Sequence, residues 1–406
     1  MCFVTVPHPL GMISKEEVNA KVDAAFDDIV KAATAWTPAK EKQDAQVKPY
    51  PAKRFKFSGT YADVNDMFQK RKWSLSLPIV PPTVDKVAAM LKGTKRDPAE
   101  VLWVVPPRQG MLTVELVAAL GVMAGAKPEH MPLLIATVEA MADPVAAWRG
   151  PTTTTAATVP VFFISGPIIE KLKLNPGTGT AGGENPVTNA LGYFVNLVGD
   201  VVGGSVPPNF DKSTHGSSAD LVAMVFTENA KENPWKTTYT EEAGFKPSDS
   251  IVTHFSAYLG NANIDHDSKT GQRLLTTLST GLLGSASGLA SCLADYDATY
   301  AINNKVSFAF IVLCPEHAAT IAKDFPDQGA ARDFMRETAA MPYKFYSQET
   351  CVPGKDFGPY DENTFIPRFK KTESIKFFVS GGPGKQSQIW VPFPQVFKPV
   401  SKKIAE

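Results

Sequence analysis

Two residues are the best candidates for acid and base chemistry in this 406-residue sequence. His215 lies in the stretch Asp211-Lys-Ser-Thr-His-Gly-Ser-Ser218, where an imidazole can exchange protons or hydrogen-bond a ligand. Glu228 follows the apolar run from Leu221 to Phe226, so we expect it at the end of a strand, where α/β sites usually form. We predict both as catalytic; a surface histidine and a salt-bridged structural glutamate are the alternatives.

A glycine-rich segment from Asn175 to Pro186 predicts a ligand-binding loop that enters a helix over 187–198. Asn185 is the expected N-cap and Pro186 the first helical residue, so free N–H groups and the positive end of the helix dipole favour an anion there. A loop whose glycines only permit close packing is the alternative. The ligand-binding residues expected here are Gly177, Gly179, Gly182, Glu184 and Asn185.

Two glycine patterns resemble nucleotide-binding motifs but lack the neighbouring residues or strand that those motifs require. Gly177-x-Gly179-x-x-Gly182 has the letters of the dinucleotide fingerprint but does not follow its strand directly. Gly381-Gly-Pro-Gly-Lys385 is not a P-loop, because Val379 stands where a glycine is needed and Gln386 replaces the magnesium-binding hydroxyl. The cofactor is therefore unassigned. Lys385 can still hold an anionic group, or it is a solvated turn lysine.

A threonine run completes the predicted ligand site. We expect Thr152, Thr153 and Thr154 to line it together with the 177–188 and 211–218 loops. None of the six histidines has His-x-x-x-His or Glu-x-x-His spacing, so the sequence predicts no local metal site.

The four cysteines are expected to be reduced thiols, since they lie far apart without a C-x-x-C pattern. Cys314 follows an apolar run and is interpreted as a small buried hydrophobe. His130 and His317 occur in two Pro-Glu-His turns that we interpret as equivalent, and both are expected to be structural.

The order of predicted helices and strands that position these residues indicates an α/β fold, with mixed or parallel sheets, flanking helices and a possible duplicated α/β unit. A capping box at Ser14-x-x-Glu17 opens an N-terminal helix, and the apolar run 101–105 is typical of a strand buried on both faces. Further strands are predicted at 158–165, 306–313 and 374–379, and helices at 84–91, 111–124, 131–141, 317–325 and 329–340.

Three segments are expected along the chain. Residues 1–58 form a helical arm and connector, 59–205 a first α/β domain containing the Thr/Gly-rich loop, and 206–406 a second α/β domain.

Composition narrows the classes of partner. Hydrophobic residues make up 44% of the chain and charged residues 20%, which indicates a globular protein rather than a disordered one. The 41 basic and 41 acidic side chains cancel, and no basic run interleaved with aromatics suggests nucleic acid. No apolar stretch approaches membrane-spanning length and no signal peptide is evident, so we expect a cytoplasmic protein.

Several phrases resemble proteins related to the UGSC-type (seleno)protein family, over roughly residues 80 to 390. They are Val104-Val-Pro-Pro-Arg108 to Val122-Met-Ala-Gly125, Lys127-Pro-Glu-His-Met-Pro132, Gly166-Pro167 with the Asn175 loop, Thr227-Glu-Asn229 with Pro234-Trp235, and Gly381-Gly-Pro-Gly-Lys385.

In that family a small domain carrying a U/C-G-S-C redox motif accompanies a larger domain with a similar α/β sequence pattern. This chain has no C-G-S-C, and its opening Phe3-Val-Thr-Val-Pro-His-Pro-Leu-Gly11 is similar to the tail of such a small domain. The resemblance therefore implies a large subunit in a hetero-oligomer, with a smaller Cys- or Sec-containing partner.

The function expected is a subunit of a cytosolic enzyme acting on a small organic anion by lyase or thiol-dependent reductive chemistry. A metal-dependent hydratase or lyase, and a non-catalytic substrate-binding scaffold, are the alternatives.

Overall fold

The computed structural model describes Val4, Val6 and residues 13–35, 51–208, 210, 213–258, 260–284, 308–345, 361–369, 371–393, 396 and 398–405. The chain divides into two compact units, residues 1–48 and 49–406. The first contains α1 (Lys15–Thr34), which begins with the predicted capping box: Ser14 accepts from the Glu17 N–H, and the Glu17 carboxylate accepts from the Ser14 N–H. Its side chains Val22, Phe26 and Ile29 are exposed.

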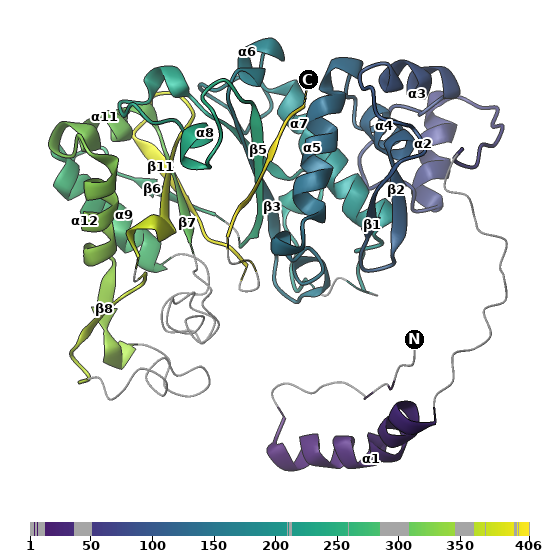
Figure 1. Ribbon diagram of the computed structural model, residues 1–406, viewed down its shortest axis with the longest axis horizontal. Helices are drawn as coiled ribbons and strands as arrows, with labels where there is room; N and C mark the ends of the chain where they lie inside the picture. Colours follow the sequence, from purple (N-terminus) through teal and green to yellow (C-terminus); the bar gives the residue numbers. More distant parts are fainter. Residues whose placement is uncertain are drawn as a thin grey trace. The chain divides into compact units, whose positions relative to one another are not determined.

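The second unit is built on two four-stranded sheets with the same topology (Figure 1). In each sheet the first strand lies at one edge and pairs in parallel with the second. The third strand is antiparallel to the second, and the fourth, at the other edge, is antiparallel to the third. In that order, the first sheet contains β4 (Met224–Thr227), β3 (Val159–Ser165), β5 (Ile251–Ala257) and β12 (Val400–Lys403), and the second contains β10 (Ile375–Val379), β7 (Ala309–Leu313), β11 (Gln386–Trp390) and β6 (Asn261–Ile264).

The two halves of this unit exchange their last strands. The chain leaves β5 in the first sheet to form β6 at the edge of the second, and it leaves β11 in the second sheet to form β12 at the edge of the first. The Pro-Glu-His phrases do not mark this repeat: His130 lies before β3, whereas His317 lies after β7. Their interpretation as equivalent turns is therefore wrong, because a short turn phrase can recur at different places in two similar units.

The two sheets pack face to face through aromatic side chains. The rings of Phe163 in β3 and Phe310 in β7 stack with centroids 4.3 Å apart, and Phe378 in β10 packs against Phe163 at 4.7 Å. Because successive side chains of a strand point to opposite faces, Phe162 and Ile311 face outward into separate cores beneath the helices.

Helices cover the outer faces of both sheets (Figure 1). On the first sheet α5 (Met131–Ala142) contacts β5 and β12, and α7 (Pro186–Asn196) contacts β4. On the second, α9 (Gly271–Gly284) contacts β6 and α12 (Gln328–Thr338) contacts β10, while α11 (Pro315–Asp324) packs on α9. The predicted α/β class, with mixed sheets and flanking helices, is confirmed.

Smaller elements complete this unit. They are α2 (Tyr61–Lys70), α3 (Val84–Leu91), α4 (Val114–Met123), α6 (Ile168–Lys171), α8 (Tyr239–Glu242), β1 (Val101–Val105), β2 (Gly110–Thr113), β8 (Ala340–Pro342) and β9 (Phe365–Pro367). Among the described helices, none combines the length and apolar character needed to span a membrane.

The strand predicted at 101–105 exists, but its predicted burial on both faces is wrong. Among the described strands it pairs only with β2, in an antiparallel hairpin outside the two main sheets, and Val101 and Val104 remain 43% and 44% exposed. A continuous apolar run shows that a strand can be buried, whereas the topology decides whether two layers cover it. Since β2 takes the residues up to Thr113, the helix predicted from residue 111 begins at Val114, with Thr113 as its N-cap.

Candidate functional site

The carboxyl ends of β3, β4, β7 and β10 meet where Glu228 pairs with Ser380. The Glu228 N–H donates to the Ile164 carbonyl at 2.9 Å, and the Ser380 N–H donates to the Leu313 carbonyl at 3.0 Å. The two residues then form an antiparallel bridge with each other, and the Ser380 hydroxyl donates to the Thr227 carbonyl at 2.7 Å. Residues from both sheets are thus fixed at the strand ends, where sites of α/β proteins commonly form.

The glycine-rich loop is bonded to this junction. The Pro176 carbonyl accepts from the Gly381 N–H at 2.8 Å, and the Thr180 hydroxyl oxygen accepts from the Thr227 N–H at 3.2 Å. The approach is closest at Gly382, where an added Cβ would lie 2.0 Å from Thr178 Oγ1. One function of the glycine-rich sequence is therefore to let the loop and the 380–385 turn pack together.

Asn185 is the N-cap residue of α7 and Pro186 its first residue, as predicted, but the predicted side-chain cap is absent. The buried Asn185 amide instead donates to the Asn175 carbonyl at 3.2 Å and to the Thr180 carbonyl at 3.1 Å. The prediction that this side chain caps the helix is therefore wrong: the two loop carbonyls hold the amide nitrogen, and the amide oxygen that a cap would use has no hydrogen-bond partner. Glu184 next to it is exposed.

Glu228 is a buried carboxyl group, with only 3% of the residue exposed. Its Oε1 accepts from the Tyr239 N–H at 2.7 Å. Burial raises the pKa of Glu228, the Tyr239 N–H acts in the opposite direction, and the charges of Glu242 and Glu241 reinforce the rise. The group therefore holds its proton to higher pH than an ordinary glutamate and can serve as an acid.

A cysteine and a histidine lie together at the end of β7. Cys314 is the N-cap residue of α11, and His317 lies in the first turn of that helix. His317 Nδ1 is 2.8 Å from Ser387 Oγ, which also accepts from the Cys314 N–H at 3.3 Å, and His317 Nε2 is 3.1 Å from the Asp265 carbonyl oxygen. Both residues are nearly buried, with 5% and 2% exposed.

The two groups shift each other's titration. Burial opposes ionisation of the Cys314 thiol, but its hydrogen bond to His317 and the charge on that ring outweigh burial, so the pKa of the thiol is lowered. Burial likewise opposes the charged form of His317, yet the Cys314 thiolate and the Asp265 carbonyl raise the pKa of the ring. Both shifts favour a thiolate beside an imidazolium, at a helix N-terminus that also favours negative charge.

The sequence analysis does not predict this pair, since its interpretation of Cys314 is a buried hydrophobe and that of His317 a structural residue. The signal was present in the spacing Cys-Pro-Glu-His directly after an apolar strand. The thiol is thereby placed at a helix N-cap, and the imidazole one turn later. The remaining cysteines, Cys2, Cys292 and Cys351, lie outside the described residues.

The predicted threonine run makes local bonds. Thr152 Oγ1 donates to the Trp148 carbonyl at 2.9 Å, and Thr153 Oγ1 donates to the Arg149 carbonyl at 2.8 Å. The neighbouring Thr155 carbonyl accepts from the Thr214 N–H at 2.9 Å, so the run contacts the segment that carries the exposed His215. Thr154 Oγ1 accepts from the N–H two residues later.

The other predicted ligand residues lie in two places. Lys385 lies in the turn that follows Ser380: its Nζ donates to the His266 carbonyl and its N–H to Glu316 Oε2, both at 2.9 Å. Gly177, Gly179 and Gly182 lie within the glycine-rich loop, where the Gly182 N–H donates to the Gly179 carbonyl at 2.7 Å. Part of this loop and Ser218 border a cavity of about 350 Å³ whose lining residues include no cation.

Within the part of the chain that the structure describes, no three His, Cys, Asp or Glu side chains are grouped as a metal ion would require. No model of a known protein family matches the chain, and no curated protein matches its sequence.

Glu228→Gln should become more stable relative to the wild type as pH rises from about 4 to about 7. The unfolded carboxyl ionises near its ordinary pKa of 4.5, whereas the folded one keeps its proton to higher pH, so wild-type stability falls over this interval. Glutamine does not titrate and still offers an oxygen to the Tyr239 N–H. Urea denaturation at several pH values measures the difference; a difference that is constant or shrinks with pH would contradict a raised pKa.

Gly382→Ala should destabilise the protein by about 1 to 3 kcal/mol, because the new methyl group collides with Thr178. Gly183→Ala is the matched control, since a Cβ there has no neighbour within 4 Å, and its effect should stay within about 0.5 kcal/mol. Equal denaturation midpoints for the two variants would show that the loop is not held against the turn.

Proposed function

We propose that this protein is one subunit of an enzyme that acts on a small organic anion by thiol-dependent chemistry, with Cys314 as the reactive thiol. The observation that carries the proposal is the pairing of Cys314 with His317 at the turn between β7 and α11, where each group favours the charged form of the other. A thiolate is a far better nucleophile than a thiol, and a neighbouring imidazole is its usual proton acceptor.

The neighbours of His317 support the role of base. A carbonyl oxygen only accepts hydrogen bonds, so the contact with Asp265 places a proton on Nε2 and leaves Nδ1 as the basic nitrogen. Nδ1 is the atom near Ser387, whose hydroxyl also receives the Cys314 N–H. In the proposed step the Cys314 proton passes to His317, and the sulfur is left negatively charged.

Two further residues at the strand ends have roles in this proposal. Glu228, protonated at higher pH than an ordinary carboxyl group, is the proposed proton donor. Lys385 belongs to the turn whose N–H groups bind Glu316 at the start of α11, and it is the proposed contact for the substrate's anionic group.

A reductive reaction needs two electrons, which two thiols supply when they form a disulfide. We propose that a smaller Cys- or Sec-containing subunit provides the second thiol or selenol, and that the complex works in the cytoplasm, where a reducing environment keeps Cys314 as a thiol. A lyase reaction needs the same base and acid without the electron transfer. A non-catalytic binding protein is the second candidate, because the near-complete burial of Cys314 and His317 also suits a structural pair.

His317→Gln should slow alkylation of Cys314 by iodoacetamide at neutral pH about tenfold, because the thiol pKa rises without the ring and the thiolate fraction falls. Peptide mass spectrometry follows Cys314 separately from the other cysteines, and the pH profile of the rate should move upward in the variant.

His266→Gln is the control, since His266 is exposed and bonds Lys385 only through its backbone carbonyl. Unchanged Cys314 reactivity in His317→Gln, or the same loss in both variants, would reject an activated thiol.

A further inference from the structure

A cavity of about 590 Å³ lies beside α8 and the first residues of β10 and β12, away from the strand-end junction. Its apolar wall contains Phe308, Ala243 and Pro399, and its polar groups come from lysine, glutamate, serine and tyrosine side chains. Ligand sites in proteins typically have volumes of roughly 300 to 1,000 Å³ and combine an apolar wall with a few polar groups.

The alternation of side chains along β10 explains why a lysine of this strand lines the cavity. In β10 the residues Ile375 and Phe377 face the helices, so Lys376 and Phe378 point toward the facing sheet. Phe378 joins the aromatic core there, whereas Lys376, at the beginning of the strand, lines the cavity. A lysine on an otherwise apolar inner face is unusual, because a buried charge needs a partner.

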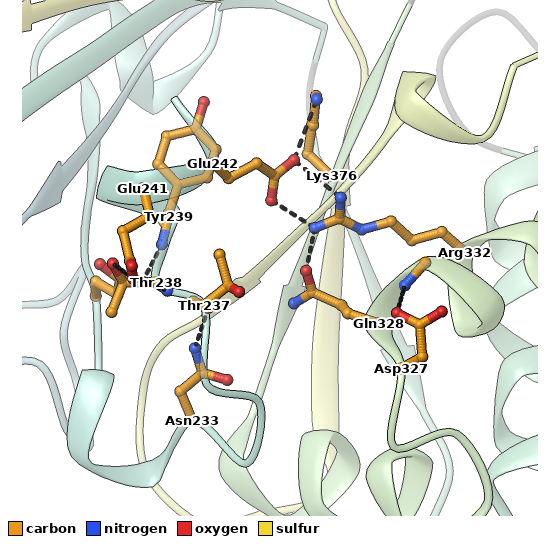
Figure 2. Close-up of polar contacts among 12 residues, drawn as sticks. Asn233, Thr237, Thr238, Tyr239, Glu241, Glu242, Asp327, Gln328, Arg332 and Lys376 are labelled. Carbon is orange, nitrogen blue, oxygen red and sulfur yellow. Dashed lines mark hydrogen bonds and ion pairs between the residues drawn. The ribbon is translucent and has the colours of Figure 1, made fainter. Parts of the chain in front are cut away.

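Glu242 of α8 is that partner, and Figure 2 shows it between two cations. Its Oε1 lies 3.1 Å from Lys376 Nζ and 2.9 Å from Arg332 Nη1, and its Oε2 binds Arg332 Nη2. Gln328 accepts a further hydrogen bond from Arg332, whose guanidinium also lies over the Phe377 ring. One carboxylate therefore faces two cations, in a network that is fixed on three elements.

The charges around the cavity do not cancel. Three lysines, Lys371, Lys376 and Lys398, line the cavity together with two carboxylates, Glu242 and Glu373. Arg332 is not part of the lining, but it shares the Glu242 carboxylate with Lys376. Asp143, which also attracts Lys398, is already paired with Lys402 Nζ at 2.8 Å. The lining therefore has one more positive than negative charge, and the Arg332 guanidinium bound to Glu242 supplies a second.

We infer that this cavity binds a small organic dianion, such as a dicarboxylate or a phosphate monoester with an apolar body. The two lysines outside the Glu242 network, Lys371 and Lys398, take the two negative charges. The apolar part of the ligand packs on Phe308 and Pro399, and Tyr239 and Ser401 provide hydroxyl groups. The site is separate from Cys314 and goes beyond the proposed thiol chemistry.

Isothermal titration calorimetry on the full chain tests this with succinate, adipate and phenyl phosphate as dianions, and butyrate and benzoate as monoanions. At least one dianion should bind about tenfold more tightly than its monoanionic analogue. Lys371→Gln with Lys398→Gln should weaken its binding about tenfold or more, whereas Glu373→Gln, at an exposed position, should strengthen it.

Lys70→Gln with Lys86→Gln is the matched control, because both lysines are exposed and lie outside the cavity lining. Cys314→Ser should bind the dianion as the wild type does, which separates this inference from the proposed function. Failure of every dianion to bind, equal loss in the two double variants, or no gain in Glu373→Gln would overturn it.

Discussion

The backbone bridge between Glu228 and Ser380 is the interaction on which the strand-end site depends. It joins β4 and β10, the edge strands of the two sheets. The sheets also meet at a second backbone bridge, between Ala257 and Pro392, and through the stacking of rings such as Phe163 and Phe310. Because Glu228 also bonds the Ile164 carbonyl and Ser380 the Leu313 carbonyl, the bridge fixes all four parallel strand ends together. A buried carboxyl group is costly, so its retention at this point suggests a role beyond packing.

The strand-end junction and the lysine-rich cavity differ in their chemistry, and α8 contributes residues to both. The Tyr239 N–H binds the Glu228 carboxylate, while the Tyr239 ring lines the lysine-rich cavity and Glu242, one turn later, holds Lys376 and Arg332. A change in the charge of Glu228 would therefore act directly on the first residue of the helix that forms the cavity wall. The proposed thiol lies on the other side of Ser380, at the end of β7.

Local patterns predicted much of the fold, and contacts between distant residues decided the rest. The capping box at Ser14, the strand at 159–165 and the first residue of α7 follow from short-range rules. The exposure of β1 and the amide bonds of Asn185 depend on which segments pack together, and no local pattern contains that information. Glu228 could be placed at a strand end from the sequence, whereas the pairing of Cys314 with His317 and the charge balance around Glu242 became apparent only with the tertiary contacts.

The central claim is that His317 lowers the pKa of the Cys314 thiol. The most direct measurement is a pH titration of thiolate ultraviolet absorbance in a folded variant that retains Cys314 and carries serine at Cys2, Cys292 and Cys351. The account predicts a midpoint below the value of about 8.5 for an ordinary cysteine. A midpoint at or above that value would contradict it, and would leave Cys314 as a buried structural residue.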